Sequence, residues 1–235
     1  MGTLQIILLC VCSMLALIFI IIRAKFGGLG AFLLKTLASF GLVASALISI
    51  AYSPVLADNR LILSLIGIGL LLGMIGDMVL DLKVIYDNDR IYLNSGMLSF
   101  GLGHLAYFSA FSLFAISLNC DLLMPILVSA GCAIVLTIAI VLSSKKMQLN
   151  FGNFLWQTVA YTFILTFMSA YTLILSIIGG ANWLAFVGMI LFFLSDIVLS
   201  LQYFGGKLNN KWLIVINHTL YYAAQIIILA VLMIM

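Results

Sequence analysis

Two acidic residues lie in long apolar segments of this sequence, where charged side chains are rare. Asp77 stands near the end of the apolar run 61–82, and Asp196 lies in an equally apolar run further along the chain. A carboxylate at the centre of a membrane helix costs roughly 2.5–3.5 kcal/mol on insertion scales, so it normally faces a polar interior and marks function. We therefore expect Asp77 and Asp196 to be two walls of one site.

A third acid accompanies the first of these two. Asp81 follows Asp77 at the i+4 position, so the two carboxyl groups share one helix face. Asp81 is nearer the end of its segment, where it is either solvated at the interface or part of the same site. Lys35 lies inside the segment 29–51, and its long side chain either reaches the interface or serves as counter-ion to the buried acids.

Other polar residues recur at intervals of three or four, so each set shares one helix face. One set contains His104 and Tyr107, and the last apolar segment contributes His218, Tyr222 and Gln225. Depth can be counted at 1.5 Å per residue from the cytoplasmic helix ends. Similar depths of roughly 8–15 Å result for five polar residues, namely Lys35, Asp77, Asp196, His218 and Tyr222. Such a layer predicts one hydrated pocket that opens toward the cytoplasmic leaflet.

The composition determines the class of protein that must position these residues. The chain has 235 residues, of which 66% are hydrophobic and 7% charged, whereas soluble domains carry about 25% charged residues. Apolar runs of about 20 residues span a bilayer as helices. The sequence predicts an all-α polytopic membrane protein, a single transmembrane domain whose eight helices lie at about 4–22, 29–51, 61–82, 92–117, 122–143, 154–178, 182–204 and 212–234.

The basic residues predict how these helices are oriented. Of the ten, eight follow the first, third, fifth and seventh segments, Lys35 lies inside the second segment, and Arg60 alone lies in a loop of the other set. By the positive-inside rule the basic loops are cytoplasmic and both termini face outward.

The first segment lacks a basic leader, so we expect a retained helix rather than a cleaved signal peptide. The positive net charge reflects this asymmetry and does not indicate nucleic-acid binding. A compact chain of this kind suits a bacterial inner membrane. The basic loop residues are Arg23, Lys25, Lys83, Arg90, Lys145, Lys146, Lys207 and Lys211.

Two pairs of segments indicate an internal repeat. Residues 32–38 (FLLKTLA) resemble residues 154–160 (FLWQTVA) at an offset of 122, and the residues around Asp77 resemble those around Asp196 at an offset of 119. Near-equal offsets predict two four-helix halves in the same orientation, an arrangement that places a site between the halves. Asp77 and Asp196 would then be equivalent residues, and Lys35 and Gln157 likewise.

Four short motifs, in their order and spacing, carry a resemblance to a known family. They are Gly76-Asp77-x-x-Leu80, Phe100-x-x-x-His104-x-x-Tyr107, Phe193-x-Ser195-Asp196 and Tyr221-Tyr222-Ala223-Ala224-Gln225. In this combination the chain resembles the YhhN family of integral-membrane lysoplasmalogenases. It departs from the family's usual Lys-Pro in the second segment, where it has Lys35-Thr36.

The resemblance implies a lysophospholipid substrate within the membrane lipid and catalysis without a cofactor. The reaction would hydrolyse the sn-1 vinyl ether of a lysoplasmalogen, giving a fatty aldehyde and glycerophosphoethanolamine or glycerophosphocholine. It makes Asp77 and Asp196 the catalytic pair. His104, Tyr107, Ser195, Tyr222 and Gln225 would be supporting residues, together with Lys35. Asp81 and His218 do not fall on family positions, and Asp81 is added to the supporting residues because it shares a helix face with Asp77.

The chemistry of a vinyl ether fits this pair of acids independently. The ether hydrolyses by proton transfer to its β-carbon, which gives an oxocarbenium ion that water captures. One carboxyl group must therefore stay protonated near neutral pH, and burial away from water favours the uncharged form of a carboxyl group. A second carboxylate stabilises the cation or activates water, as in glycosidases. The sequence leaves open which aspartate is the acid.

A metal-dependent membrane hydrolase is one alternative. His104, His218, Asp77 and Asp196 together are a donor set that suits zinc. No two of them form an i, i+4 pair on one helix, however, and the four cysteines lack CxxC spacing. We therefore expect neither a metal site nor a disulfide.

A proton-coupled transporter is an alternative from a different functional class. Intramembrane acids and repeated helical halves are common among transporters. Solute flux into proteoliposomes, abolished by Asp77→Asn, would favour transport over hydrolysis.

Overall fold

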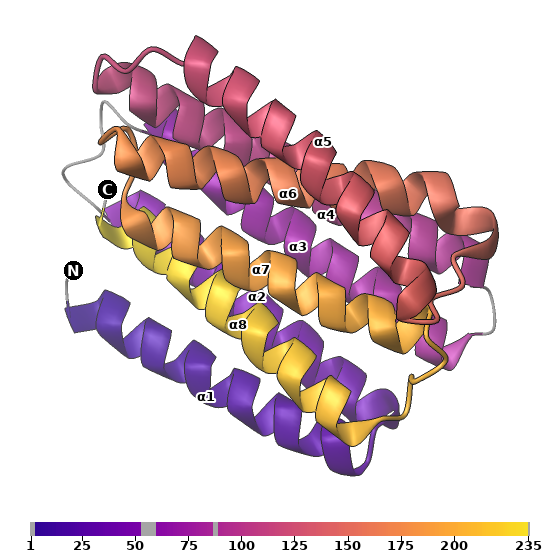
Figure 1. The fold of residues 1–235 in the computed structure, drawn as a ribbon. Coiled ribbons are helices and arrows are strands. Elements are labelled where there is room, and N and C mark those ends of the chain that lie inside the picture. The colour runs from indigo at the N-terminus through magenta and orange to yellow at the C-terminus, as the bar shows by residue number, and fades with distance from the viewer. Residues whose placement is uncertain (1–2, 53–59, 87–88, 235) are drawn as a thin grey trace.

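Eight long helices account for almost all of the described part of the chain. A computed structural model describes residues 3–52, 60–86 and 89–234, without the side chains of residues 52, 83–85 and 89. All eight helices in these ranges are long and apolar enough to cross a membrane, which confirms the predicted all-α membrane fold (Figure 1). They are α1 (Thr3–Lys25), α2 (Gly28–Tyr52), α3 (Arg60–Ile85), α4 (Asp89–Ser117), α5 (Leu123–Lys146), α6 (Leu155–Ile177), α7 (Trp183–Tyr203) and α8 (Lys211–Ile234).

Several helices extend beyond the apolar segments from which they were predicted. α1 continues through Arg23 to Lys25, and α5 continues through Lys145 to Lys146. Basic side chains in a last turn interact favourably with the partial negative charge of the helix end, so the helix continues after hydropathy falls. The side chain of Lys83, counted above among the basic loop residues, lies outside the described part of the chain.

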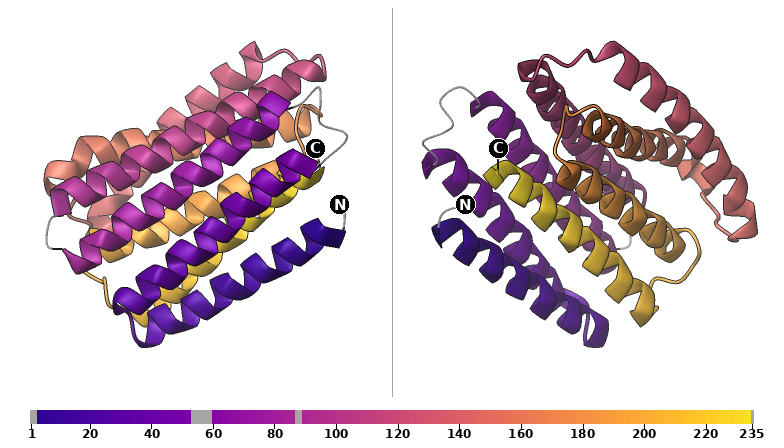
Figure 2. Two further views of the ribbon diagram at one scale, coloured as in Figure 1. Left: turned by 180° about the vertical axis from the view of Figure 1, so that it is seen from behind. Right: turned by 60° about the vertical axis from the view of Figure 1, so that its left-hand side comes forward.

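The order of packing is the same in the two halves of the chain. α1 packs against α2, α2 against α3 and α3 against α4, and α5 to α8 repeat these neighbours in sequence. Packing between consecutive helices is common to up-and-down bundles, so the parallel repeat stays a prediction. The halves join where α8 packs on α1, α2 and α3, and where α4 packs on α6. Figure 2 shows α5 on the outside of the bundle, beside α6. Both termini lie at one end of the molecule (Figure 1).

Glycines on α3 let large side chains from other helices approach its backbone. A Cβ atom at Gly76 would lie 2.7 Å from the ring of Phe100 on α4, and one at Gly73 would lie 2.9 Å from the amide nitrogen of Gln225 on α8. Because small residues permit close helix approach in membranes, α3 can pack tightly against both helices. The face of α3 that carries Asp77 is therefore covered by α4 and α8.

Candidate functional site

A polar cavity of about 530 Å³ lies among α1, α2, α3, α7 and α8. Asp77 and Asp196 both line it, one from each half of the bundle. The cavity reaches the loops that connect α1 to α2 and α7 to α8, where Gly27 and Asn209 contribute to its wall. It therefore extends toward the end of the bundle that carries the basic loops, away from both termini.

Four charged side chains form a buried network on one side of this cavity. The ammonium group of Lys35 lies 3.1 Å from Asp77 and 3.3 Å from Asp81, and Arg23 lies 4.0 Å from Asp81. Lys35, Asp77 and Asp81 are 5%, 3% and 4% exposed. Two cations thus balance two anions on the wall of the cavity, and Arg23 is the most exposed of the four, at 14%. Lys35 is a counter-ion in this structure rather than a side chain extended to the interface, and Asp81 is not the solvated residue that its place near the helix end allowed.

Asp77 accepts hydrogen bonds from two hydroxyl groups in addition to its ion pair. Ser39 on α2 donates to Oδ2 over 2.7 Å, and Tyr221 on α8 donates to the same oxygen over 2.8 Å. The hydroxyl of Tyr222 lies 3.3 Å from that of Ser39 and donates to the backbone oxygen of Lys35. Three helices thus hold this carboxyl group in one position.

A chain of hydrogen bonds continues from Asp77 toward the interior of the bundle. The amide nitrogen of Gln225 donates to the hydroxyl of Tyr221 over 3.0 Å. Tyr107 on α4 donates to the amide oxygen of Gln225 in a longer bond of 3.5 Å. Tyr107 and Gln225, both expected to support the site, therefore reach Asp77 through Tyr221.

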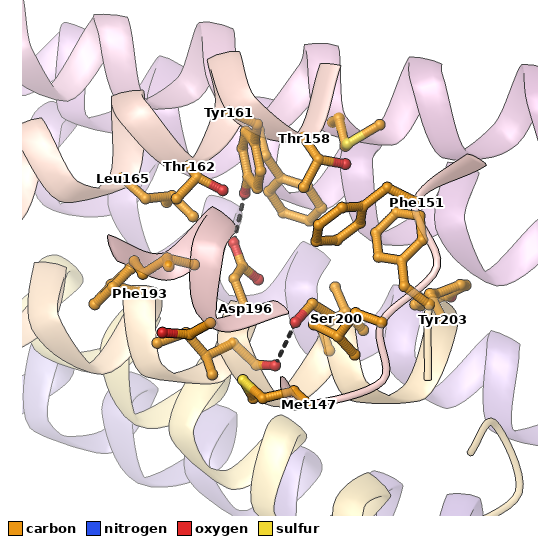
Figure 3. Close-up of a pocket in the computed structure, with 18 of the residues that line it drawn as sticks. Met147, Phe151, Thr158, Tyr161, Thr162, Leu165, Phe193, Asp196, Ser200 and Tyr203 are labelled. Carbon is orange, nitrogen blue, oxygen red and sulfur yellow. Dashed lines mark hydrogen bonds between the residues drawn. The ribbon is translucent and has the colours of Figure 1, made fainter. Parts of the chain in front are cut away.

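Asp196 has different surroundings. Tyr161 on α6 donates a short hydrogen bond of 2.6 Å to its Oδ2 atom (Figure 3). The neighbouring Ser195 donates to the backbone oxygen of Phe192, and its own backbone oxygen accepts from Asn217 on α8. Ser195 therefore helps to fix the position of α7 against α8.

A second, apolar cavity of about 250 Å³ lies on the other side of Asp196, among α3, α4, α5, α6 and α7. Figure 3 shows Asp196 and Tyr161 among the side chains around it, with Phe193 and Leu165 nearby. Asp196 also lines the polar cavity. Its carboxyl group therefore stands at the boundary between a polar and an apolar compartment.

The two histidines occupy different places. His104 is buried and packs edge-on against Phe192 at 4.6 Å between ring centroids. It is not among the residues that line either cavity, and neither ring nitrogen has a hydrogen-bond partner within the described chain. His218 lines the polar cavity and packs against Phe19. Among the described residues, no three His, Cys, Asp or Glu side chains are grouped so that they could hold a metal ion.

Sequence reasoning missed several residues that contact the acids. Ser39, Tyr161 and Tyr221 were not singled out as partners of the aspartates. The repeat contained a signal for one of them, because the offset of 122 that relates Lys35 to Gln157 also relates Ser39 to Tyr161. Each of these hydroxyls donates to the aspartate of its own half.

The equivalence expected between Lys35 and Gln157 does not extend to a shared place in the site. Gln157 is exposed, and it lines neither cavity. A residue one turn further along the helix, Tyr161, makes the contact with the acid instead. Arg23 was counted only as a basic loop residue, yet it joins the buried charge network.

Comparison with known proteins gives one match. The YhhN family model matches residues 30–232, which is most of the chain and includes both aspartates but not Arg23. No curated protein and no solved structure matches.

Proposed function

Since this chain belongs to the YhhN family, as its motifs indicated, we propose that it is a membrane lysoplasmalogenase. It hydrolyses the sn-1 vinyl ether of a lysoplasmalogen to a fatty aldehyde and a glycerophospholipid headgroup. The observation that carries the proposal is the placement of two carboxyl groups in unlike surroundings, Asp77 buried and Asp196 half-buried, on the wall of one cavity.

The two acids differ in their surroundings, and this difference assigns each of them a catalytic role. Asp77 accepts from an ammonium group and two hydroxyls, which are the partners of an ionised carboxylate. Asp196 instead accepts a hydrogen bond from the neutral hydroxyl of Tyr161, and it lies at the boundary of the two cavities. Asp196 is therefore the proton donor, and Asp77 stabilises the cationic intermediate.

The reaction proceeds in three steps. Asp196 gives its proton to the vinyl carbon that does not bear oxygen, and the π electrons form the new C–H bond. The oxocarbenium ion that results is captured by water at the carbon next to oxygen, and the water proton returns to Asp196. The hemiacetal then collapses as its hydroxyl proton is lost and the glycerol oxygen takes up a proton. The sum consumes one water and yields aldehyde and alcohol.

The remaining charged residues serve the acids and the substrate headgroup. Lys35 neutralises Asp77 and Asp81 and so is not available as a phosphate ligand. Arg23, in the last turn of α1 and on the wall of the polar cavity, is the cation placed to meet a phosphate. With the basic loops in the cytoplasm of a bacterium and both termini outside, the headgroup would enter from the inner leaflet.

The test supplies purified protein with 1-alkenyl lysophospholipid and measures free aldehyde. Asp77→Asn and Asp196→Asn should each reduce turnover by at least about 100-fold, the scale that removing a general acid costs. Ser112→Ala, which removes a buried hydroxyl that contacts only Tyr171, is the control for folding and should leave turnover near wild type. Near-normal turnover in either aspartate variant would contradict the two-carboxyl mechanism.

The same experiment separates hydrolysis from transport. If the wild-type protein releases no aldehyde but carries a labelled solute into proteoliposomes, and Asp77→Asn abolishes that flux, the buried charges serve a carrier. Aldehyde release that depends on both aspartates supports the hydrolase.

A further inference from the structure

The apolar cavity and the polar cavity share part of their walls. Leu80, Phe100 and Asp196 line both. The remainder of the apolar cavity is walled mainly by aliphatic and aromatic side chains such as Leu165 and Phe193. An amphiphile with one polar end and one apolar end matches such a pair of compartments.

The apolar cavity also reaches the lipid-facing side of the bundle. α5 packs principally against α6, and it contributes Leu136 and Ala139 to the cavity wall. Both residues are exposed although they line a cavity, Leu136 by 46%. The space between α5 and α7 is therefore accessible from the surface that the bilayer covers.

From these observations we propose that the apolar cavity holds the hydrocarbon chain of the substrate, which enters sideways from the membrane between α5 and α7. The proposal rests on the proposed function for the identity of the amphiphile. It adds the site of the chain, its route of entry and the position of the cleaved bond. With the headgroup in the polar cavity and the chain in the apolar one, the bond between them lies against Asp196.

The chemistry of the wall favours a chain over other occupants. A polar solute would leave its hydrogen-bonding groups unpaired against aliphatic and aromatic side chains, which is costly. A hydrocarbon chain moves from the apolar interior of the bilayer to another apolar environment, so its transfer costs little free energy. Asp196 is the one acid among the described residues of this wall. With the hydrocarbon chain in the cavity, the ether bond at the polar end of that chain therefore lies beside Asp196.

The test uses a lysophospholipid whose sn-1 chain is joined by a saturated ether and carries a diazirine at its far end. This lipid is not hydrolysed, so labelling reports binding alone. After irradiation in lipid nanodiscs, the label should map by mass spectrometry to cavity residues of α5, α6 and α7, such as Leu136 and Leu165. Mapping in the wild-type protein tests the site without any variant.

Two phenylalanine substitutions on α5 form a matched pair. Ala139→Phe fills the cavity and should lower labelling inside it by about tenfold, equivalent to about 1.4 kcal/mol of binding. Ile138→Phe places the same ring on a neighbouring exposed position that does not line the cavity, and it should change labelling little.

The outcomes distinguish this proposal from the proposed function. Labels spread over the outer faces of the helices, or equal effects of the two variants, would overturn the chain site. If label enters the cavity but the vinyl-ether lipid releases no aldehyde, the chain site stands and the proposed hydrolysis fails. If aldehyde is released while the label lies elsewhere, the reverse holds.

Discussion

Replacing Tyr161 by phenylalanine tests the assignment of Asp196 most directly. The substitution removes one hydroxyl and leaves the ring in place, and that hydroxyl makes the 2.6 Å hydrogen bond to the Asp196 carboxyl group. When Asp196 gives up its proton it becomes a carboxylate, and the hydrogen bond from Tyr161 strengthens with the developing charge. Hydrogen bonds to charged groups contribute about 1.5–3 kcal/mol. At 1.36 kcal/mol per factor of ten, the variant should lose roughly 10- to 150-fold in kcat.

The assay is aldehyde release at saturating lysolipid, compared with the same substitution at Tyr171. Tyr171 is fully buried, whereas Tyr161 is half-buried, and it likewise shares a hydrogen bond, of 2.8 Å, with another side chain, the hydroxyl of Ser112. It lines neither cavity. Tyr171→Phe should therefore lose a comparable, small amount of stability while retaining turnover.

Two results would refute the reasoning. Turnover of Tyr161→Phe above half of the wild-type value would mean that the hydroxyl does not stabilise the carboxylate of the acid. An equal loss in Tyr171→Phe would mean that any buried tyrosine hydroxyl matters for folding, with no particular role for the one beside Asp196.

The remaining predictions concern stability. Lys35→Met leaves the Asp77 and Asp81 carboxylates facing each other without the ammonium group and should lower the free energy of unfolding by about 3–5 kcal/mol. A thermal melt in detergent measures the loss, and adding Asp81→Asn should restore part of the stability. A further, additive loss in the double variant would contradict the charge-balance argument. Gly76→Ala would place a Cβ atom 2.7 Å from the Phe100 ring and should destabilise the protein by about 1–3 kcal/mol. Gly131→Ala, where an added Cβ meets no atom within 4 Å, should instead be neutral or stabilising by up to about 1 kcal/mol. The melting temperature should therefore fall for Gly76→Ala and stay level or rise for Gly131→Ala.

The buried charges have a consequence for how the halves of the bundle are held together. Arg23, Lys35 and the two acids of α3 join α1, α2 and α3 of the first half. α8 of the second half reaches the same network through Tyr221 and Tyr222. Because a buried charge without its partner is strongly destabilising, these contacts restrict how α8 can pack on the first half. The positions of Asp77 and Asp196 relative to each other follow from that packing.

Sequence alone determined the eight helices and singled out the acids as candidates. In a bilayer every backbone polar group must find a partner within the chain, so an apolar run of about 20 residues has to be a helix. Because an ionisable side chain within the bilayer costs free energy, Asp77 and Asp196 could be selected as candidates from the sequence alone. The charge of Lys35 made it a candidate counter-ion in the same way.

Only the tertiary structure decided which neutral side chains serve those acids. Tyr161 is one of nine tyrosines in a chain rich in aromatic residues, and a hydroxyl in an apolar helix carries little cost that would reveal its role. Its contact with Asp196 depends on the rotation of α6 relative to α7, as the contact of Tyr221 with Asp77 depends on the glycine-lined approach of α8 to α3. The two cavities have the same origin, because each is a space left among several helices, and no single segment of the sequence encodes it.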